Sequence, residues 1–283
     1  MKYILRYIYM LLCEIKSVFI KNKVIRYLEK SSISDVQPVI AKLKNSFKLS
    51  VFPYNYVNEY YSKKIDVYKD KTCGLFYVMD EGRKLYFSKK FRFKFHVRNY
   101  YRNLCIEQDK RSPHCYTSDT FSVDNDSVLL DVGAAEGIVA LRNIEKVSQV
   151  YCFECDESWI EALEHTFSFC RDKVHIIRKF VSDKDDEQNM TLDSMNSSGK
   201  SYFVKLDIEG METVALSKSM KFIRNADCVR LSVCTYHKSS HLREISEMFK
   251  NSITEVSDGY MFFYYDKEFS EPYIRRGILR ILL

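Results

Sequence analysis

Two glycines and an acid after a short apolar run form the part of this chain with the clearest chemical meaning. Residues 128–130 lead into Asp131, and Gly133 and Gly137 follow four residues apart. Glycine lets a backbone approach a ligand where a Cβ would collide. The dinucleotide fingerprint G-x-G-x-x-G has a different spacing, which argues against a dehydrogenase. The spacing suits S-adenosylmethionine, whose methionine end needs no pyrophosphate seat. We predict a cofactor loop made of Asp131, Gly133, Ala135, Glu136 and Gly137.

Acids at the ends of two further apolar runs extend this site. Glu154 ends the run 149–154, where a carboxylate can accept hydrogen bonds from both ribose hydroxyls. An exposed acid at a strand end is the alternative, and the neighbouring motifs favour the cofactor. Asp183 follows the next run and is predicted to accept a hydrogen bond from the adenine amine.

The segment 202–212 places several ionisable residues at one strand end. Asp207 and Glu209 are two residues apart and therefore share a face. We expect Asp207 to contact the cofactor and to hold the acceptor hydroxyl, act as a base or bind a divalent cation, with Glu209 and Glu212 in support. Pairing with Lys205 or with loop amides is the alternative. A magnesium site needs several converging oxygens, so no metal site is predicted, and a metal requirement stays open.

Methyl transfer from a sulfonium is a direct displacement, so the protein must chiefly align the reacting groups. A sugar hydroxyl is a poor nucleophile and needs a base or a metal. His237 follows the fifth expected strand, and His114 precedes the glycine loop. Both are predicted as candidate bases beside Asp207, although a lone histidine is more often structural.

The ordered set of these motifs resembles the FkbM-type methyltransferases, which use S-adenosylmethionine. The resemblance covers about residues 105–266 and is most specific in Lys205-x-Asp207-x-Glu209-Gly210. It implies O-methylation of a hydroxyl on a sugar or related small molecule. We further predict Lys205, Glu209 and Gln108 near the substrate. Many members carry asparagine where this chain has Ala135, so one cofactor contact must come from elsewhere. The matched segments are 131–137, 153–156, 181–183, 191–193 and 204–210, with 107–116 upstream.

These residues need a sheet to position them. Apolar runs at 127–132, 149–154, 174–178, 202–207, 227–234 and 260–266 alternate with helical patterns. Such alternation predicts a mostly parallel sheet covered on both faces, with ligands outside the carboxyl ends of its strands. We expect a Rossmann-like class I methyltransferase fold with a seven-stranded sheet over residues 116–283. Residues 1–115 are expected to form an extension, with helices at 1–30 and 34–48 and a hairpin at 74–87.

The amino-acid composition indicates what kind of protein this is and in which compartment it is expected. The chain has 283 residues, and a hydrophobic content of 46% fits a real core. Nine cysteines without framework spacing predict a reducing, cytoplasmic compartment and no zinc or disulfide chemistry. The apolar N-terminus is broken by charges, which argues against a spanning helix, and lacks a signal-peptide cleavage site.

Net charge is +6, and the basic residues are clustered. Basic and aromatic residues alternate over 90–98, which predicts a strand with a basic face for an anionic acceptor, or simply a solvated face. The N-terminal helix and the tail 272–283 permit peripheral contact with the inner face of an anionic membrane. Packing of both ends on the globule is the favoured alternative.

Two other functions compete with small-molecule O-methylation. Base N-methyltransferases carry an Asn/Asp-Pro-Pro-aromatic element after the fourth strand, where this chain has residues 207–210, and the acids there repel phosphate. We therefore expect no nucleic-acid partner. A non-catalytic, cofactor-binding membrane-surface protein is the other reading, and the intact glycine loop argues against it.

Overall fold

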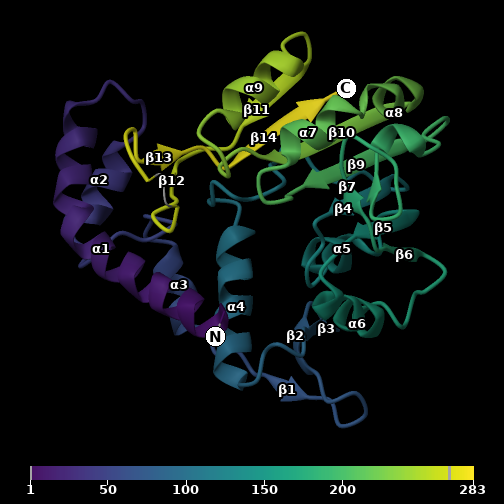
Figure 1. Cartoon of the computed structure of the whole chain (residues 1–283), viewed down its shortest axis with the longest axis horizontal. Helices are drawn as coiled ribbons and strands as arrows, with labels where there is room; N and C mark the ends of the chain where they lie inside the picture. Colours follow the sequence, from purple (N-terminus) through teal and green to yellow (C-terminus); the bar gives the residue numbers. More distant parts are fainter. Residues whose placement is uncertain (1, 267–268) are drawn as a thin grey trace.

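The computed structural model describes residues 2–266 and 269–283, with side chains from residue 9 onward. Its described residues form a seven-stranded sheet in the order β11-β14-β10-β9-β4-β5-β6 (Figure 1). The sheet strands are β4 (Val128–Val132), β5 (Gln149–Phe153), β6 (Val174–Ile177), β9 (Ser201–Leu206), β10 (Cys228–Cys234), β11 (Ile253–Val256) and β14 (Ile278–Leu282). β14 runs antiparallel to both neighbours, whereas β10, β9, β4, β5 and β6 are parallel. The mostly parallel sheet of the predicted fold class is confirmed.

Alternate residues of the sheet serve two separate cores. Leu129 and Phe203 belong to the core on one face, and Leu130 and Val204 to the core on the other. Both faces are therefore apolar and need cover. The first core takes side chains from α4 (Lys94–Glu107), α5 (Ile138–Asn143) and α6 (Glu157–Thr166). The second takes them from α7 (Glu212–Ser217), α8 (Met220–Asn225) and α9 (His241–Met248).

The predicted hairpin is present and packs on the first core. It consists of β2 (Phe76–Asp80) and β3 (Arg83–Phe87), with β1 (Tyr68–Lys69) at its edge. Val78, Leu85 and Phe87 are buried against the sheet. The hairpin is thus part of the sheet domain's packing and not a separate cap. Short elements complete the domain: β7 (Phe180–Val181), β8 (Asn189–Met190) and the 3₁₀ turn η1 (Leu192–Ser194).

The basic strand predicted over 90–98 is wrong. The chain enters α4 at Lys94, and Phe93 and Phe95 are exposed and stack on each other. Val97, Tyr100, Tyr101 and Leu104 pack against the first core instead. Their spacing is helical and extends beyond the alternating segment, so burial of this longer apolar stripe decides the structure. The expectation of an anionic acceptor loses its basis.

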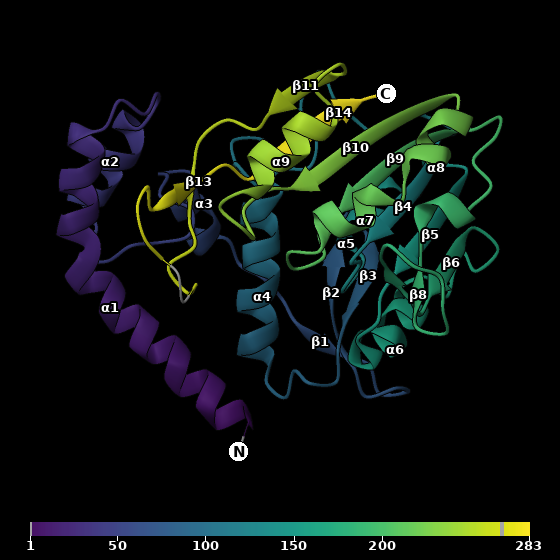
Figure 2. The same cartoon turned by 45° about the horizontal axis from the view of Figure 1, so that its top comes forward.

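A second lobe contains α1 (Lys2–Lys30), α2 (Gln37–Lys44), α3 (Val57–Ser62) and the small ribbon β12 (Met261–Phe262) and β13 (Ile274–Arg275). In Figures 1 and 2 this lobe lies on the far side of α4 from the sheet. Val24, Leu28 and Leu43 pack with Phe262 and Ile274 in its core. The strand predicted at 260–266 therefore belongs to this lobe and not to the main sheet. The chain returns to the N-terminal lobe after residue 257, so a single boundary at residue 115 does not separate the two parts.

The C-terminal tail completes the sheet. Residues 278–282 form β14 between β10 and β11, and Ile278, Leu279 and Ile281 are fully buried. Arg280 is buried too and donates to the carbonyls of Cys115 and Thr117. These buried residues of the tail cannot contact a membrane, so the predicted membrane contact through the tail is wrong. The contact through the N-terminal helix stays a prediction, since Leu12, Ile15 and Phe19 of α1 are exposed. Among the described helices, none combines the length and apolarity needed to cross a bilayer.

Candidate active site

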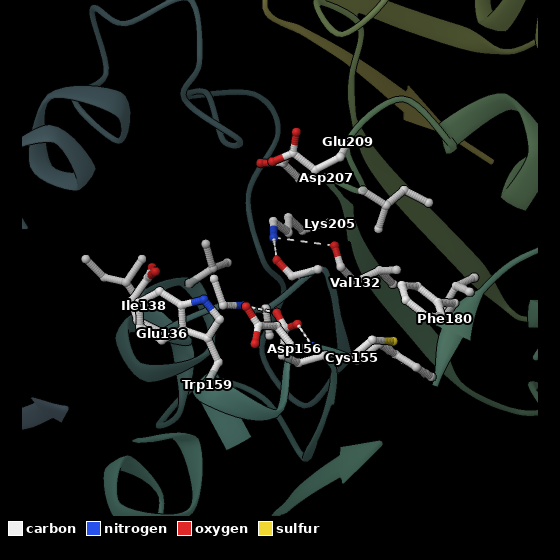
Figure 3. Close-up of a pocket in the computed structure, with 18 of the residues that line it drawn as sticks. Val132, Glu136, Ile138, Cys155, Asp156, Trp159, Phe180, Lys205, Asp207 and Glu209 are labelled. Atoms are coloured by element: carbon white, nitrogen blue, oxygen red, sulfur yellow. Dashed lines mark hydrogen bonds between the residues drawn. The ribbon is translucent and has the colours of Figure 1, made fainter. Parts of the chain in front are cut away.

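A cavity of about 1070 Å³ opens at the carboxyl ends of β4, β5 and β9 (Figure 3). Residues 132–136, 153–156, 205 and 207–209 contribute most of its sheet side. The end of α4 and the segment 179–182 line other parts. Parallel strands place their carboxyl ends at one edge, where ligands bind in open α/β sheets. The predicted motifs therefore converge on one cavity.

The glycine loop lies against the end of β9. Gly133 has φ of +77°, and a Cβ at this position would lie 2.0 Å from the carbonyl oxygen of Asp207. Gly137 also has a positive φ, and its Cβ would meet Leu163 and Phe167 of the α6 region at 2.8 and 2.9 Å. Gly133 lines the cavity, whereas Gly137 is absent from its described lining. The second glycine thus serves helix packing.

Glu154 faces the glycine loop across the cavity floor. Its Oε2 accepts a hydrogen bond from the amide of Ala135 at 2.8 Å, and its Oε1 accepts one from the amide of Asp156 at 2.7 Å. Ala135 has φ of +47°, which turns its amide toward that carboxylate. A carboxylate has about four acceptor positions, so two stay free for hydroxyl donors. Glu154 lines the cavity directly after the end of β5.

Lys205 and Asp131 form a buried ion pair beneath the loop. Their side chains are 5% and 1% exposed, and Nζ lies 3.1 Å from Oδ1. The lysine also donates to the carbonyl of Gly133. Burial disfavours its charge, but Asp131 and Asp207 hold the pKa of Lys205 above its ordinary value. The pair therefore fixes the loop to β9, which assigns Lys205 a structural contact besides its place in the cavity wall.

Asp207 is the predicted residue at the centre of the site. Its Oδ2 accepts a hydrogen bond from the hydroxyl of Tyr116 at 2.7 Å, and its Oδ1 accepts one from Tyr236 at 3.3 Å. Burial opposes the charge of Asp207, yet Lys205 and the two histidines hold its pKa below the ordinary value. The carboxylate lines the cavity and is 20% exposed. An ionised acceptor is therefore fixed at the cavity surface.

His237 and His114 lie behind Asp207 and outside the described cavity lining. His237 Nε2 is 3.5 Å from Asp207 Oδ1, and its Nδ1 is 2.8 Å from Glu212. Although burial disfavours the imidazolium, Glu212 and Asp207 raise the pKa of His237. His114 Nε2 is 3.0 Å from the hydroxyl of Tyr236 and 3.9 Å from Asp207 Oδ2. Neither histidine is in the described cavity lining, and both contact Asp207 instead, so their prediction as bases that touch the acceptor is not supported by the geometry.

Burial lowers the pKa of His114 to about 4, although Asp207 opposes the shift. The unfolded chain binds the proton at its ordinary pKa of about 6.5, so the folded state loses stability as pH falls from 6.5 to 4. We expect wild type to lose up to about 3 kcal/mol more unfolding free energy than His114→Gln over this window. Urea unfolding at both pH values measures the difference. The exposed His96→Gln serves as control, and equal losses in wild type and His114→Gln would contradict the assignment.

Other predicted residues divide between the cavity and the surface. Gln108, Glu136 and Glu209 line the cavity. Burial raises the pKa of Glu136 to about 7, and its Oε2 accepts a hydrogen bond from Tyr100. Asp183 is exposed and outside the described lining, whereas Ser182 lines the cavity. The predicted adenine contact through Asp183 is therefore not supported by the geometry, because the strand end turns its neighbour inward.

Several cavity residues were not among the predicted site residues. Tyr100 and Glu107 come from α4, Trp159 from α6 and Tyr116 from the segment before β4. The alternating pattern over 90–98 led to the prediction of a strand in place of α4, so Tyr100 and Glu107 were not predicted as site residues. Glu107 sits beside Gln108 in the segment 107–116, which was the available signal. Burial and the nearby carboxylates raise the pKa of Glu107 to about 8.

Two groups of side chains have the spacing of metal ligands: His114, Asp207 and Cys234, and Asp207, Glu212 and His237. Glu212 Oε1 already accepts hydrogen bonds from the amides of Ile208 and Gly210, besides its contact with His237. These contacts account for the second group as a hydrogen-bonded network. A requirement for a divalent metal therefore stays open, as it was in the sequence analysis.

The sheet order, the antiparallel β14 and the cavity at the strand ends define a Rossmann-like class I methyltransferase fold. No family model and no curated protein matches the sequence. Solved structures do show similar folds, at low identity. The structure of the methyltransferase FkbM from Methylobacillus flagellatus KT is 17% identical, with a TM-score of 0.47. The match covers 66% of this chain and 53% of that one, so this chain spans about half of its length.

Two further solved structures illustrate the range of similar folds. An rRNA methylase from Streptococcus thermophilus is 10% identical, with a TM-score of 0.37, and the match covers 56% of this chain and 87% of that one. The protein SMU.1697c from Streptococcus mutans, solved in complex with SAH, is 12% identical with a TM-score of 0.38. That match covers 57% of this chain and 91% of the other. Similarity at these identities concerns the fold alone.

Proposed function

We propose that this protein is an S-adenosylmethionine-dependent methyltransferase that methylates a hydroxyl of a sugar or related small molecule. The observation that carries the proposal is the position of Glu154 opposite the Gly133 loop, at one edge of the sheet and on the wall of one cavity. A loop that admits only glycine beside an acid that retains free acceptor positions suits a nucleoside with a ribose. The resemblance of the motifs to FkbM-type enzymes supports the O-methyl assignment.

The residues present fit the cofactor. Gly133 lets the loop lie directly against the end of β9, where a Cβ would meet the Asp207 carbonyl oxygen, and Glu154 offers acceptors to the ribose hydroxyls. Trp159, Phe180 and Val181 supply apolar surface to the cavity, which suits a flat base. Glu136 supplies a carboxyl group for the amine of the methionine end. When bound, the cofactor supplies a methyl group on a positively charged sulfur.

Asp207 is the group we assign to the acceptor hydroxyl. It is ionised, lies on the cavity wall and has its orientation fixed by Tyr116 and Tyr236. A carboxylate so placed accepts the hydroxyl proton as the oxygen becomes nucleophilic. His237 stands behind it and is held by Glu212, so the pair stabilises the geometry of Asp207 without touching the acceptor.

Replacement of Glu154 tests the cofactor site. We expect Glu154→Gln to weaken binding of S-adenosylhomocysteine by about 10- to 100-fold, because hydrogen bonds to a charged group contribute about 1.5–3 kcal/mol. Calorimetry on the full chain measures the affinity. Glu157→Gln, three residues on and exposed, is the matched control. Failure of wild type to bind either the donor or S-adenosylhomocysteine would refute the proposed function.

A further inference from the structure

The cavity holds more than a cofactor site. Ligand pockets commonly have volumes of about 300–1,000 Å³, and this cavity reaches about 1070 Å³. Figure 3 shows Asp156 and Trp159 on one side and Asp207 and Glu209 on the other. Glu154 and the apolar surface account for the first side. The second side is available to the methyl acceptor, and Glu107, whose charge Asp207 opposes, lines the same cavity.

Carboxyl groups from three separate elements meet on this acceptor side. Glu107 is the last residue of α4, Asp207 follows β9, and Glu209 stands in the next turn with φ of +56°. The side chains of Glu107 and Glu209 have no hydrogen-bond or ion-pair partner among the side chains described for residues 9–266 and 269–283. The carbonyl end of the 14-residue α4 adds negative potential at Glu107.

The cations that line the cavity are already engaged, as far as the described residues show. Lys205 pairs with Asp131 and Lys90 with Asp156, at 3.1 and 2.7 Å. Lys179 donates to the carbonyl of Asp186 at 2.8 Å. An anionic acceptor would therefore face carboxylates without a free counter-charge, and repulsion would exclude it.

We propose that the methyl acceptor is a cation, a sugar or related hydroxyl compound that carries a protonated amine against Glu107, Asp207 and Glu209. The inference rests on the proposed methyltransferase function. Burial and neighbouring carboxylates raise the pKa of Glu107 to about 8, so this group holds a proton near neutral pH in the free protein. An ammonium group beside it favours the ionised form. Binding of the amine therefore releases protons.

Oligosaccharides that differ in one functional group test the inference. The full chain, saturated with S-adenosylhomocysteine, is titrated at about pH 5.5, where the amines of the probe are already protonated, with chitosan tetrasaccharide, chitin tetrasaccharide and tetragalacturonate. We expect the free amine to bind at least tenfold more tightly than the acetylated form and the acid not to bind. The heat for the amine should vary with the ionisation enthalpy of the buffer, because protons are released. Equal affinity for amine and acetamide, preference for the acid, or no binding of the amine overturns the inference.

Glutamine variants test whether Glu107 and Glu209 cause the preference for the amine. Glu107→Gln and Glu209→Gln should each weaken chitosan binding about tenfold, and Glu107→Gln should remove the proton release. The exposed Glu187→Gln is the control. Binding of S-adenosylhomocysteine, measured first in each protein, separates the two proposals. If the wild-type protein does not bind S-adenosylhomocysteine, the methyltransferase function is refuted. If it binds S-adenosylhomocysteine but does not prefer the amine, only the cationic acceptor is refuted.

Discussion

Replacement of Gly133 by alanine should lower the affinity for S-adenosylhomocysteine at least 100-fold. The new Cβ would lie 2.0 Å from the Asp207 carbonyl oxygen, far inside van der Waals contact, and the residue would keep a φ of +77°. Left-handed backbone costs a residue with a Cβ about 1–2 kcal/mol. The overlap adds to this, because relief requires the loop to leave the end of β9. That movement displaces both the loop and Asp207, on which cofactor and acceptor binding depend.

Gly82→Ala separates the overlap from the backbone strain. Gly82 has φ of +84° in the β2–β3 turn, and no atom lies within 4 Å of its hypothetical Cβ. Both variants carry the same kind of strain, but only Gly133→Ala meets a neighbour. Thermal unfolding and calorimetry of both proteins report stability and affinity separately. If Gly133→Ala bound S-adenosylhomocysteine as Gly82→Ala does, the assignment of the loop would be wrong.

Asp207→Asn should reduce methyl transfer by about 100- to 10,000-fold, the usual contribution of a positioned base. Asparagine retains an oxygen for Tyr116 or Tyr236 but cannot take up the hydroxyl proton. The affinity for S-adenosylhomocysteine should change less than tenfold, because Gly133 and Glu154 are untouched. Incorporation of a labelled methyl group into a cell extract measures transfer.

Tyr116→Phe provides a graded comparison for this residue. It removes one hydrogen bond to the carboxylate and leaves the carboxylate itself, so a loss of about tenfold is expected. The exposed Asp119→Asn is the control for a lost surface charge. A transfer rate within tenfold of wild type for Asp207→Asn would move the role of base to another residue.

The sheet and the cofactor loop were predictable because their signals are local. Each sheet strand from β4 to β10 is a short apolar run, and two-sided burial demands such runs. Gly133 and Glu154 are placed by those strands, since parallel strands bring their carboxyl ends together. The N-terminal helix and the β2–β3 hairpin also follow from local periodicity and turn residues. These predictions agree with the structure.

Other predictions failed where distant contacts decide. The alternation over 90–98 predicts a strand, yet Val97 and Tyr100 are buried on a helix face that continues to residue 107. The segment 260–266 is apolar enough for the main sheet, but it pairs as β12 with β13 in the N-terminal lobe. The charge of Arg280 predicts that the tail lies on the surface. In the structure Arg280 is buried instead, and the carbonyl oxygens of residues 115–117 accept its hydrogen bonds.

The sequence by itself determined the order of the functional segments along the chain: a glycine bend after the first sheet strand, an acid after the second, and a Lys-x-Asp-x-Glu segment that spans the end of the fourth. The periodicity of apolar residues and the need for glycine at a positive φ depend only on residues close together in the chain, so both can be recognised in the sequence. Only the tertiary structure decided which side chains face the cavity. It set His237 and His114 behind Asp207, turned Asp183 outward and brought Glu107 from α4 to the acceptor side. These outcomes depend on packing between segments far apart in the chain, which no local pattern records.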